Sequence, residues 1–147
     1  MLGTVVAVLS LPTLREGNNR SIEREAIKAL RTIEKAQRTF RKNDSEGDGI
    51  EDFGTLAELG RAGLIGPDLA SGVLRGFRIE VLPAQADATT LWTGVANRTE
   101  MHSGRSFVIN QRGVIHYAWG ETISIDAHHG VLPPGVNRME RRAEERF

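Results

Sequence analysis

One amphipathic stretch constrains the fold of this chain more than any other feature. From about Arg20 to about Arg41, apolar residues recur at spacings of three and four, the period of a helix that buries one face. The apolar positions are Ile22, Ala26, Ala29, Leu30, Ile33, Ala36 and Phe40. The charged positions between them predict a solvated outer face: Glu23, Arg24, Lys28, Arg31, Glu34, Lys35 and Arg38. Glu34 lies four residues before Arg38, which permits an ion pair. The apolar face of such a helix must pack against another part of the chain.

The sequence after this helix predicts a body of mostly β-structure. A polar loop at 43–52 and a short helix at 55–64 come first, and a further turn is expected within 68–74. The pattern then changes to an alternation of apolar and polar residues, typical of strands with one wet face. Strands are predicted at 76–82, 89–96, 105–109 and 114–118, with an edge strand at 122–126. Asn110 to Gly113 form a hairpin turn in which Gly113 suits a positive φ. The fold class is therefore α+β, with a long N-terminal helix packed on a small antiparallel sheet.

The 147 residues suit one domain, with distinct segments at its two ends. Residues 1–19 are predicted to be an apolar segment followed by a turn at 16–19, where Asn18, Asn19 or Ser21 could cap the next helix. Residues 20–135 form the globular domain, which Pro133, Pro134 and Gly135 are expected to end. Residues 136–147 form a charged tail.

The apolar start of the chain, residues 1–14, allows two interpretations. It carries no charge, but a membrane span needs about 20 such residues. A secretory signal would need a positive flank and a cleavage site. The segment is either a buried strand or short helix, or an incomplete membrane or packing helix. Pro12 is expected to kink or interrupt any helix here, because it lacks an N–H and clashes with the preceding turn.

The acidic loop at 43–52 is the best candidate for chemistry. Counted as a calcium-binding loop, it would offer oxygen ligands from Asp44, Glu46, Asp48, the Ile50 carbonyl and Asp52. Thr55 stands at the twelfth position, where a bidentate carboxylate is required, so only a weak site is expected. The alternative is a polar turn between two helices.

Composition and motifs narrow the function classes. The chain has no cysteine, which excludes disulfides and thiolate chemistry, and 19 basic residues balance 19 acidic ones. This balance predicts no nucleic-acid binding. Trp92, Tyr117 and Trp119 are interpreted as core anchors rather than a binding face. His102, His116, His128 and His129 lack the spacing of a zinc site, and no nucleophile elbow or phosphate-binding loop occurs. We expect no enzymatic activity.

Several short segments, in order, resemble those of type IV pilins and the related pseudopilins. Residues 26–40 read AIKALRTIEKAQRTF, followed by FGTLAEL at 53–59 and GLI at 63–65. LASG at 69–72, GF at 76–77, GRSFVI at 104–109 and RGVI at 112–115 continue the series. The resemblance covers roughly residues 2–118. Pro12 matches the proline of the family's N-terminal helix, whereas the family's charged leader, cleavage site and glutamate have no counterpart here. We expect either a truncated start or a divergent relative.

The resemblance implies a structural subunit that self-assembles through its N-terminal helix, alone or with other pilin-like subunits of a type IV pilus or type II secretion system. The residues that would form the assembly surface are Val5, Val6, Val8, Leu9, Leu11, Pro12 and Leu14. The resemblance implies a place in the cell envelope or outside the cell. Processing and membrane insertion are not carried over, because the residues that direct them have no counterpart here; the incomplete apolar helix leaves membrane contact as an expectation of its own. The alternative function is an extracytoplasmic binding module, calcium-stabilised, that shares the pilin-like body.

Overall fold

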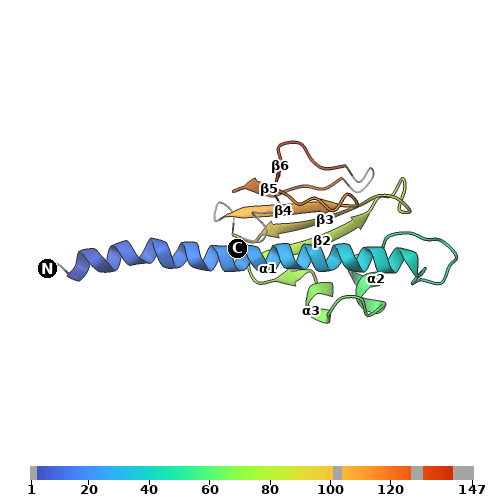
Figure 1. The fold of residues 1–147 in the computed structure, drawn as a ribbon, viewed down its shortest axis with the longest axis horizontal. Helices are drawn as coiled ribbons and strands as arrows, with labels where there is room; N and C mark the ends of the chain where they lie inside the picture. The colour runs from blue at the N-terminus through green and yellow to red at the C-terminus, as the bar shows by residue number, and fades with distance from the viewer. Residues whose placement is uncertain (1–2, 101–103, 127–130, 141–147) are drawn as a thin grey trace.

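The computed structural model contains one long N-terminal helix packed against a six-stranded antiparallel sheet (Figure 1). It describes residues 3–100, 104–126 and 131–140, and the side chains of the long helix from Gly17 onward. The predicted α+β class is confirmed.

The long helix, α1, spans Gly3–Lys42 without a break. The turn predicted at 16–19 is therefore wrong, and Pro12 does not end the helix. Gly17, Asn18 and Asn19 have low helix propensity, but the helical turns on both sides and contacts with the sheet outweigh it. The strand alternative for the start of the chain is also excluded, because residues 3–14 are helical.

The predicted apolar stripe of α1 is the buried face. Leu30 and Ile33 are completely buried, Phe40 is 2% exposed, and the remaining stripe positions are buried as well. All of them except Ala29 join Phe77, Phe107 and other sheet residues in the main hydrophobic core. The prediction for the charged face fails most clearly at Glu23, which is only 4% exposed because it pairs with a sheet arginine described below. Arg31 and Glu34 of this face are half-buried.

Two short helices follow the loop after α1. Helix α2 spans Leu56–Arg61 and α3 spans Pro67–Ala70. Thr55 begins α2 with a capping box, in which its side chain accepts from the Glu58 N–H at 3.3 Å and the Glu58 carboxylate accepts from the Thr55 N–H at 2.7 Å. The short helix predicted at 55–64 is thus present in a shorter form.

A buried glutamine joins α1 to the segment that leads into α2. The Gln37 side chain donates to the Gly54 carbonyl at 2.6 Å and accepts from the Gly54 N–H at 2.9 Å. A Cβ atom at Gly54 would lie 3.0 Å from the Phe40 ring, so a larger residue would push against the core. Glutamine and glycine thus form one structural unit, although 17 residues separate them.

The sheet is a meander whose strands lie in chain order from β1 to β6. The strands are β1 Val73–Leu74, β2 Phe77–Pro83, β3 Trp92–Arg98, β4 Arg105–Asn110, β5 His116–Trp119 and β6 Asn137–Arg138. The hairpin between β4 and β5 has the predicted form, since the Gly113 N–H donates to the Asn110 carbonyl at 2.9 Å and Gly113 has a φ of 71°. One face of the sheet packs on α1.

The other face of the sheet carries a second, smaller core. It contains Val95, Val108, Ala118 and Ile123. The edge strand predicted at 122–126 does not form; instead, the Asn97 side chain accepts from the Ile123 N–H at 2.8 Å and donates to its carbonyl at 2.9 Å. One side-chain amide thus holds this segment to the sheet, where an edge strand would use backbone hydrogen bonds.

The globular body continues past the proline-rich segment at 133–135. Strand β6 pairs with β5, and Met139 is 3% exposed within the main core. The predicted boundary between body and tail at residue 135 is therefore too early. Residues 141–147 lie outside the described residues.

Candidate functional site

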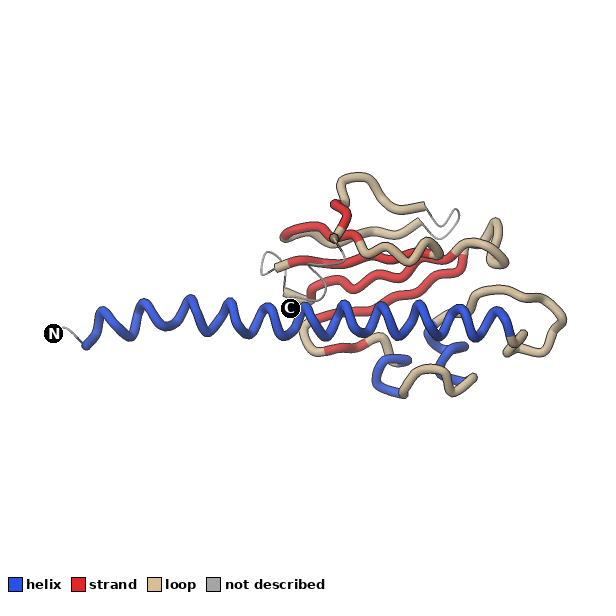
Figure 2. The backbone as a smooth tube through the Cα atoms, in the orientation of Figure 1, coloured by secondary structure: helices blue, strands red, loops and turns tan. Residues whose placement is uncertain are grey.

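The most distinctive feature of the molecule is the extension of α1 beyond the sheet. Figures 1 and 2 show the sheet alongside the C-terminal half of the helix, while its N-terminal part continues past the body. The whole helix is about 60 Å long at 1.5 Å per residue. The predicted assembly residues, from Val5 to Leu14, all lie in this extension. Their side chains are outside the described residues, so an assembly role stays a prediction.

Polar contacts fix the helix to the body at the point where the extension begins. The Asn18 side chain accepts from Arg75, in the turn between β1 and β2, at 3.0 Å. The Asn19 side chain accepts from Arg98, at the end of β3, at 2.9 Å. The two asparagines that suggested a turn in the sequence therefore serve as side-chain anchors. We call Asn18, Asn19 and Glu23, whose contact with the sheet is described next, the junction.

The strongest contact at the junction is the pair of Glu23 and Arg105. The Glu23 carboxylate accepts from the Arg105 Nη2 at 2.7 Å, from its Nε at 3.1 Å and from its backbone N–H at 3.0 Å. The two side chains are only 6% and 11% exposed. A paired, hydrogen-bonded carboxylate of this kind is strongly directional, so it fixes both the rotation and the height of α1 on the sheet.

Aromatic rings surround this arginine. The Arg105 guanidinium lies 5.3 to 5.5 Å from the ring centres of Phe107, Tyr117 and Trp119, within the range of cation–π attraction. The prediction that Trp119 anchors the core is wrong, since it is 64% exposed. Trp92 does lie in the core, at 2% exposed.

The acidic loop is organised by its own backbone. The Asp44 carboxylate accepts from the Gly49 N–H at 2.8 Å, and that of Asp48 accepts from the Ile50 N–H at 2.9 Å. Asp44 has a positive φ of 44° and Ile50 is 52% exposed. Within the described residues, no three His, Asp or Glu side chains converge on a possible metal position. Calcium binding by this loop stays a prediction.

Two carboxylates of this region have raised pKa values. Partial burial raises the pKa of Glu46, and repulsion from Glu58, Asp52 and Asp48 raises it further. Partial burial and the nearby Asp48 likewise raise the pKa of Asp52. The carboxylates of the loop and Glu58 of α2 therefore repel one another, although Arg61 of α2 lines the same recess as Glu46 and Glu58.

The remaining predicted groups are dispersed. His116 lies in β5, half-buried, with its Nδ1 3.3 Å from the Val114 carbonyl. His102, His128 and His129 fall outside the described residues. Within the described part of the chain, no helix has the length and hydropathy needed to cross a membrane.

Sequence reasoning missed the junction because its signals are long-range. Glu23 occupies a helix position next to exposed charges, and only the sheet arginine 82 residues later explains its burial. The one local hint is the position of Glu23 directly after Ile22, at the edge of the apolar stripe. Comparisons with models of known protein families, with curated proteins and with solved structures find no match for this chain.

Proposed function

We propose that this chain is a structural subunit, similar to the type IV pilins and pseudopilins, that self-assembles through its N-terminal helix. The observation that carries the proposal is the division of α1 into a half seated on the sheet and a half that extends past it (Figure 2). The extension has an apolar sequence with no charged residue before Arg15. A helix of apolar sequence that extends past its own body favours association with its own kind.

The contacts of the body support this role. A self-assembling helix must leave its body at a fixed angle, so that each copy presents the same surface. The junction meets this requirement, because Asn18, Asn19 and Glu23 bind three arginines from different parts of the sheet. The Gln37–Gly54 pair fixes the other end of the seated half. Copies packed through their extensions would carry their sheets outside, which suits a filament of the cell envelope or the extracellular space.

The experiment is a comparison of self-association between the parent chain and Val6→Asp. We expect light scattering to show assembly of the parent and its loss in the variant, with the circular dichroism of the body unchanged. Val73→Asp is the matched control, because Val73 is 70% exposed in β1 on the body. Equal assembly of all three chains would refute the proposal.

A further inference from the structure

Seven basic residues follow one face of α1. They are Arg20, Arg24, Lys28, Arg31, Lys35, Arg38 and Lys42. Each lies three or four residues after the one before it, which places them along a single line opposite the buried stripe. Arg31 is half-buried and the other six are exposed. We call this line, about 33 Å long at 1.5 Å per residue, the basic ridge.

The basic ridge is poorly neutralised within one molecule. Glu34 pairs with Arg31 at 2.9 Å and with Arg38. Within the described part of the chain, Arg24, Lys28 and Lys35 have no ion pair. Like charges at these spacings repel one another and destabilise a helix. A surface that retains such repulsion is suited to an anionic partner.

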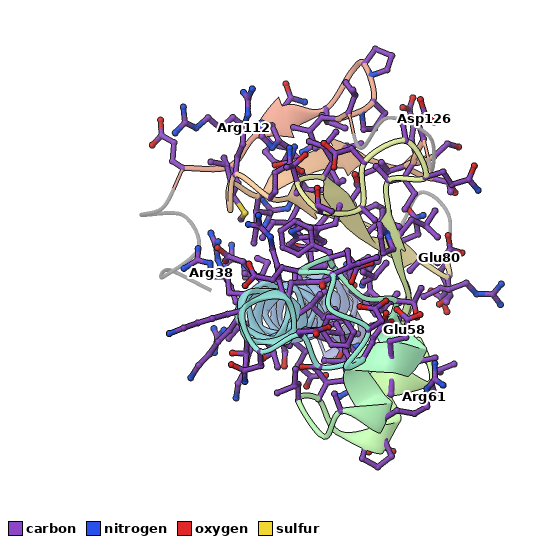
Figure 3. All side chains as sticks on the ribbon, turned by 90° about the vertical axis from the view of Figure 1, so that its right-hand side faces the viewer. Arg38, Glu58, Arg61, Glu80, Arg112 and Asp126 are labelled. Atoms are coloured by element: carbon purple, nitrogen blue, oxygen red, sulfur yellow. The ribbon has the colours of Figure 1, made fainter. Side chains whose placement is uncertain are left out.

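The rest of the body carries the complementary charge. Residues 43–140 contain thirteen acidic and seven basic residues. Five of the acidic ones lie in the loop after α1, and Glu58 lies beside them in α2; we call Asp44, Glu46, Asp48, Glu51, Asp52 and Glu58 the acidic edge. Figure 3 shows Glu58, Glu80 and Asp126, together with Arg61, on the opposite side of the body from Arg38 and Arg112.

We propose that the basic ridge of one copy packs against the acidic edge of the next copy. This inference rests on the proposed function and names the surfaces that join neighbouring bodies. The overall charge of the chain is zero, so a nucleic acid or an anionic membrane would meet repulsion from the acidic side as well as attraction to the ridge. A second copy instead presents its acidic edge to the basic ridge, so that opposite charges face each other. Because the two surfaces differ, the contact is heterologous and can continue into an open chain of subunits.

A recess at the C-terminal end of the ridge offers a place for acidic side chains. A cavity of about 470 Å³ lies there, where Arg38, Arg41 and Lys42 face Glu51 of the acidic edge, and Phe53, Thr90 and Gln111 complete its lining. The Arg41 guanidinium is held 5.3 Å from the centre of the Phe53 ring. Arg41 is not a member of the ridge, but it lies beside Arg38 and Lys42 in this lining and adds a further positive charge at this end of the helix.

The test is reciprocal charge reversal. We expect the double variant Lys28→Glu, Lys35→Glu to lose assembly by at least about tenfold in sedimentation assays, a factor equal to about 1.4 kcal/mol. The reversal Glu46→Lys, Asp48→Lys should cause a similar loss. An equal mixture of the two double variants should regain assembly, because each restores the charge that the other lacks. Assembly of the parent should weaken as salt is added.

Matched variants separate the ridge from the general effect of charge. Arg78→Glu makes the same charge change per residue on an exposed position of β2, and Lys28→Arg, Lys35→Arg keeps the ridge positive; both should assemble like the parent. Circular dichroism should show the ridge variant folded, since the new glutamates lie four residues from Arg24 and Arg31 and can pair with them. The loop variant should also be folded, since Glu46 and Asp48 are exposed and lie outside both cores.

The outcomes distinguish this inference from the proposed function. Normal assembly of the ridge variant, with loss in Val6→Asp, would overturn the ridge contact and leave the proposed function standing. Failure of the mixture to recover would exclude the acidic edge as the partner surface. Binding of the parent to phosphatidylserine vesicles, lost with the ridge charges while assembly persists, would assign the ridge to a membrane instead. A parent chain that stays monomeric would refute the proposed function itself.

Discussion

The carboxylate of Glu23 on α1 accepts three hydrogen bonds from Arg105 on β4, at 2.7, 3.0 and 3.1 Å. The pair joins residues 82 positions apart and is almost completely shielded from water. It stands where the helix leaves the body, so it links the stability of the fold to the orientation of the extension. In the proposed assembly, the pair therefore contributes both to the stability of the fold and to the packing of the extensions.

Loss of this carboxylate should destabilise the fold strongly. Glu23→Ala leaves the Arg105 guanidinium buried without its counter-charge, and we expect a fall of about 3 kcal/mol in the free energy of unfolding. Urea unfolding followed by circular dichroism measures it. The control is Glu25→Ala, an exposed position two residues later on the same helix, where a change below about 0.5 kcal/mol is expected. Similar effects at the two positions would show that the pair contributes little.

Loss of the Gln37–Gly54 contact should also lower the free energy of unfolding. Gln37→Ala removes both partners of the Gly54 peptide groups inside the core, and an unsatisfied buried polar group costs about 1–3 kcal/mol. We expect a loss of roughly that size in urea unfolding. Gln111→Ala, at a half-buried position on the β4–β5 turn, provides a comparison that should be milder. An unchanged midpoint for Gln37→Ala would indicate that water replaces the glutamine.

The buried stripe of α1 gives a third prediction. Ile33 is fully buried in the main core, and Ile33→Ala should lower the free energy of unfolding by about 2–5 kcal/mol. The neighbouring Lys35→Ala changes an exposed residue and should have almost no effect. A near-neutral result for Ile33→Ala would mean that the core closes around the missing side chain.

The acidic loop predicts a pH dependence with a definite sign. The raised pKa values of Glu46 and Asp52 mean that the folded state holds these protons more firmly than the unfolded chain. Their contribution to stability is therefore full at acidic pH and is lost as the pH rises through their folded pKa values. Asp52→Asn should stabilise the protein by about 0.5 kcal/mol at pH 7 and by almost nothing near pH 3.

Thermal melts of Asp52→Asn and the parent across this range measure the difference. Glu121→Gln, an exposed carboxylate outside the loop, serves as the control and should give no such pH-dependent gain. A larger gain for Asp52→Asn at pH 3 than at pH 7 would contradict the assigned direction of the pKa shift.

The sequence predicted those parts of the fold that depend on residues close together in the chain. The spacing of Ile22, Leu30, Ile33 and Phe40 identified the buried face of α1, because a helix repeats every 3.6 residues wherever it packs. Gly113 marked the β4–β5 turn, because the turn needs a positive φ. The α+β class followed from the change of period between the two halves of the chain.

Features that depend on distant partners escaped prediction. Asn18 and Asn19 favour turns locally, yet they lie within α1 and bind Arg75 and Arg98 from the sheet. Residues 122–126 have a strand-like pattern, but the Asn97 side chain takes up the peptide groups of Ile123 instead. Most of the basic ridge was predicted to lie on the charged face of the helix, but the zero net charge of the whole chain concealed the separation of its charges.

The most direct test of the central claim is a cross-linking scan along the extension of α1. The chain contains no cysteine, so single substitutions such as Val5→Cys, Val8→Cys and Leu9→Cys report only contacts between copies. The variants are assembled, oxidised mildly and separated on non-reducing gels, with Val73→Cys on the body as the control. Self-assembly through the helix predicts disulfide-linked dimers that recur at helical spacing along residues 4–14 and are weak at position 73. Cross-linking that is absent from the extension, or equally strong at every position, would contradict the claim.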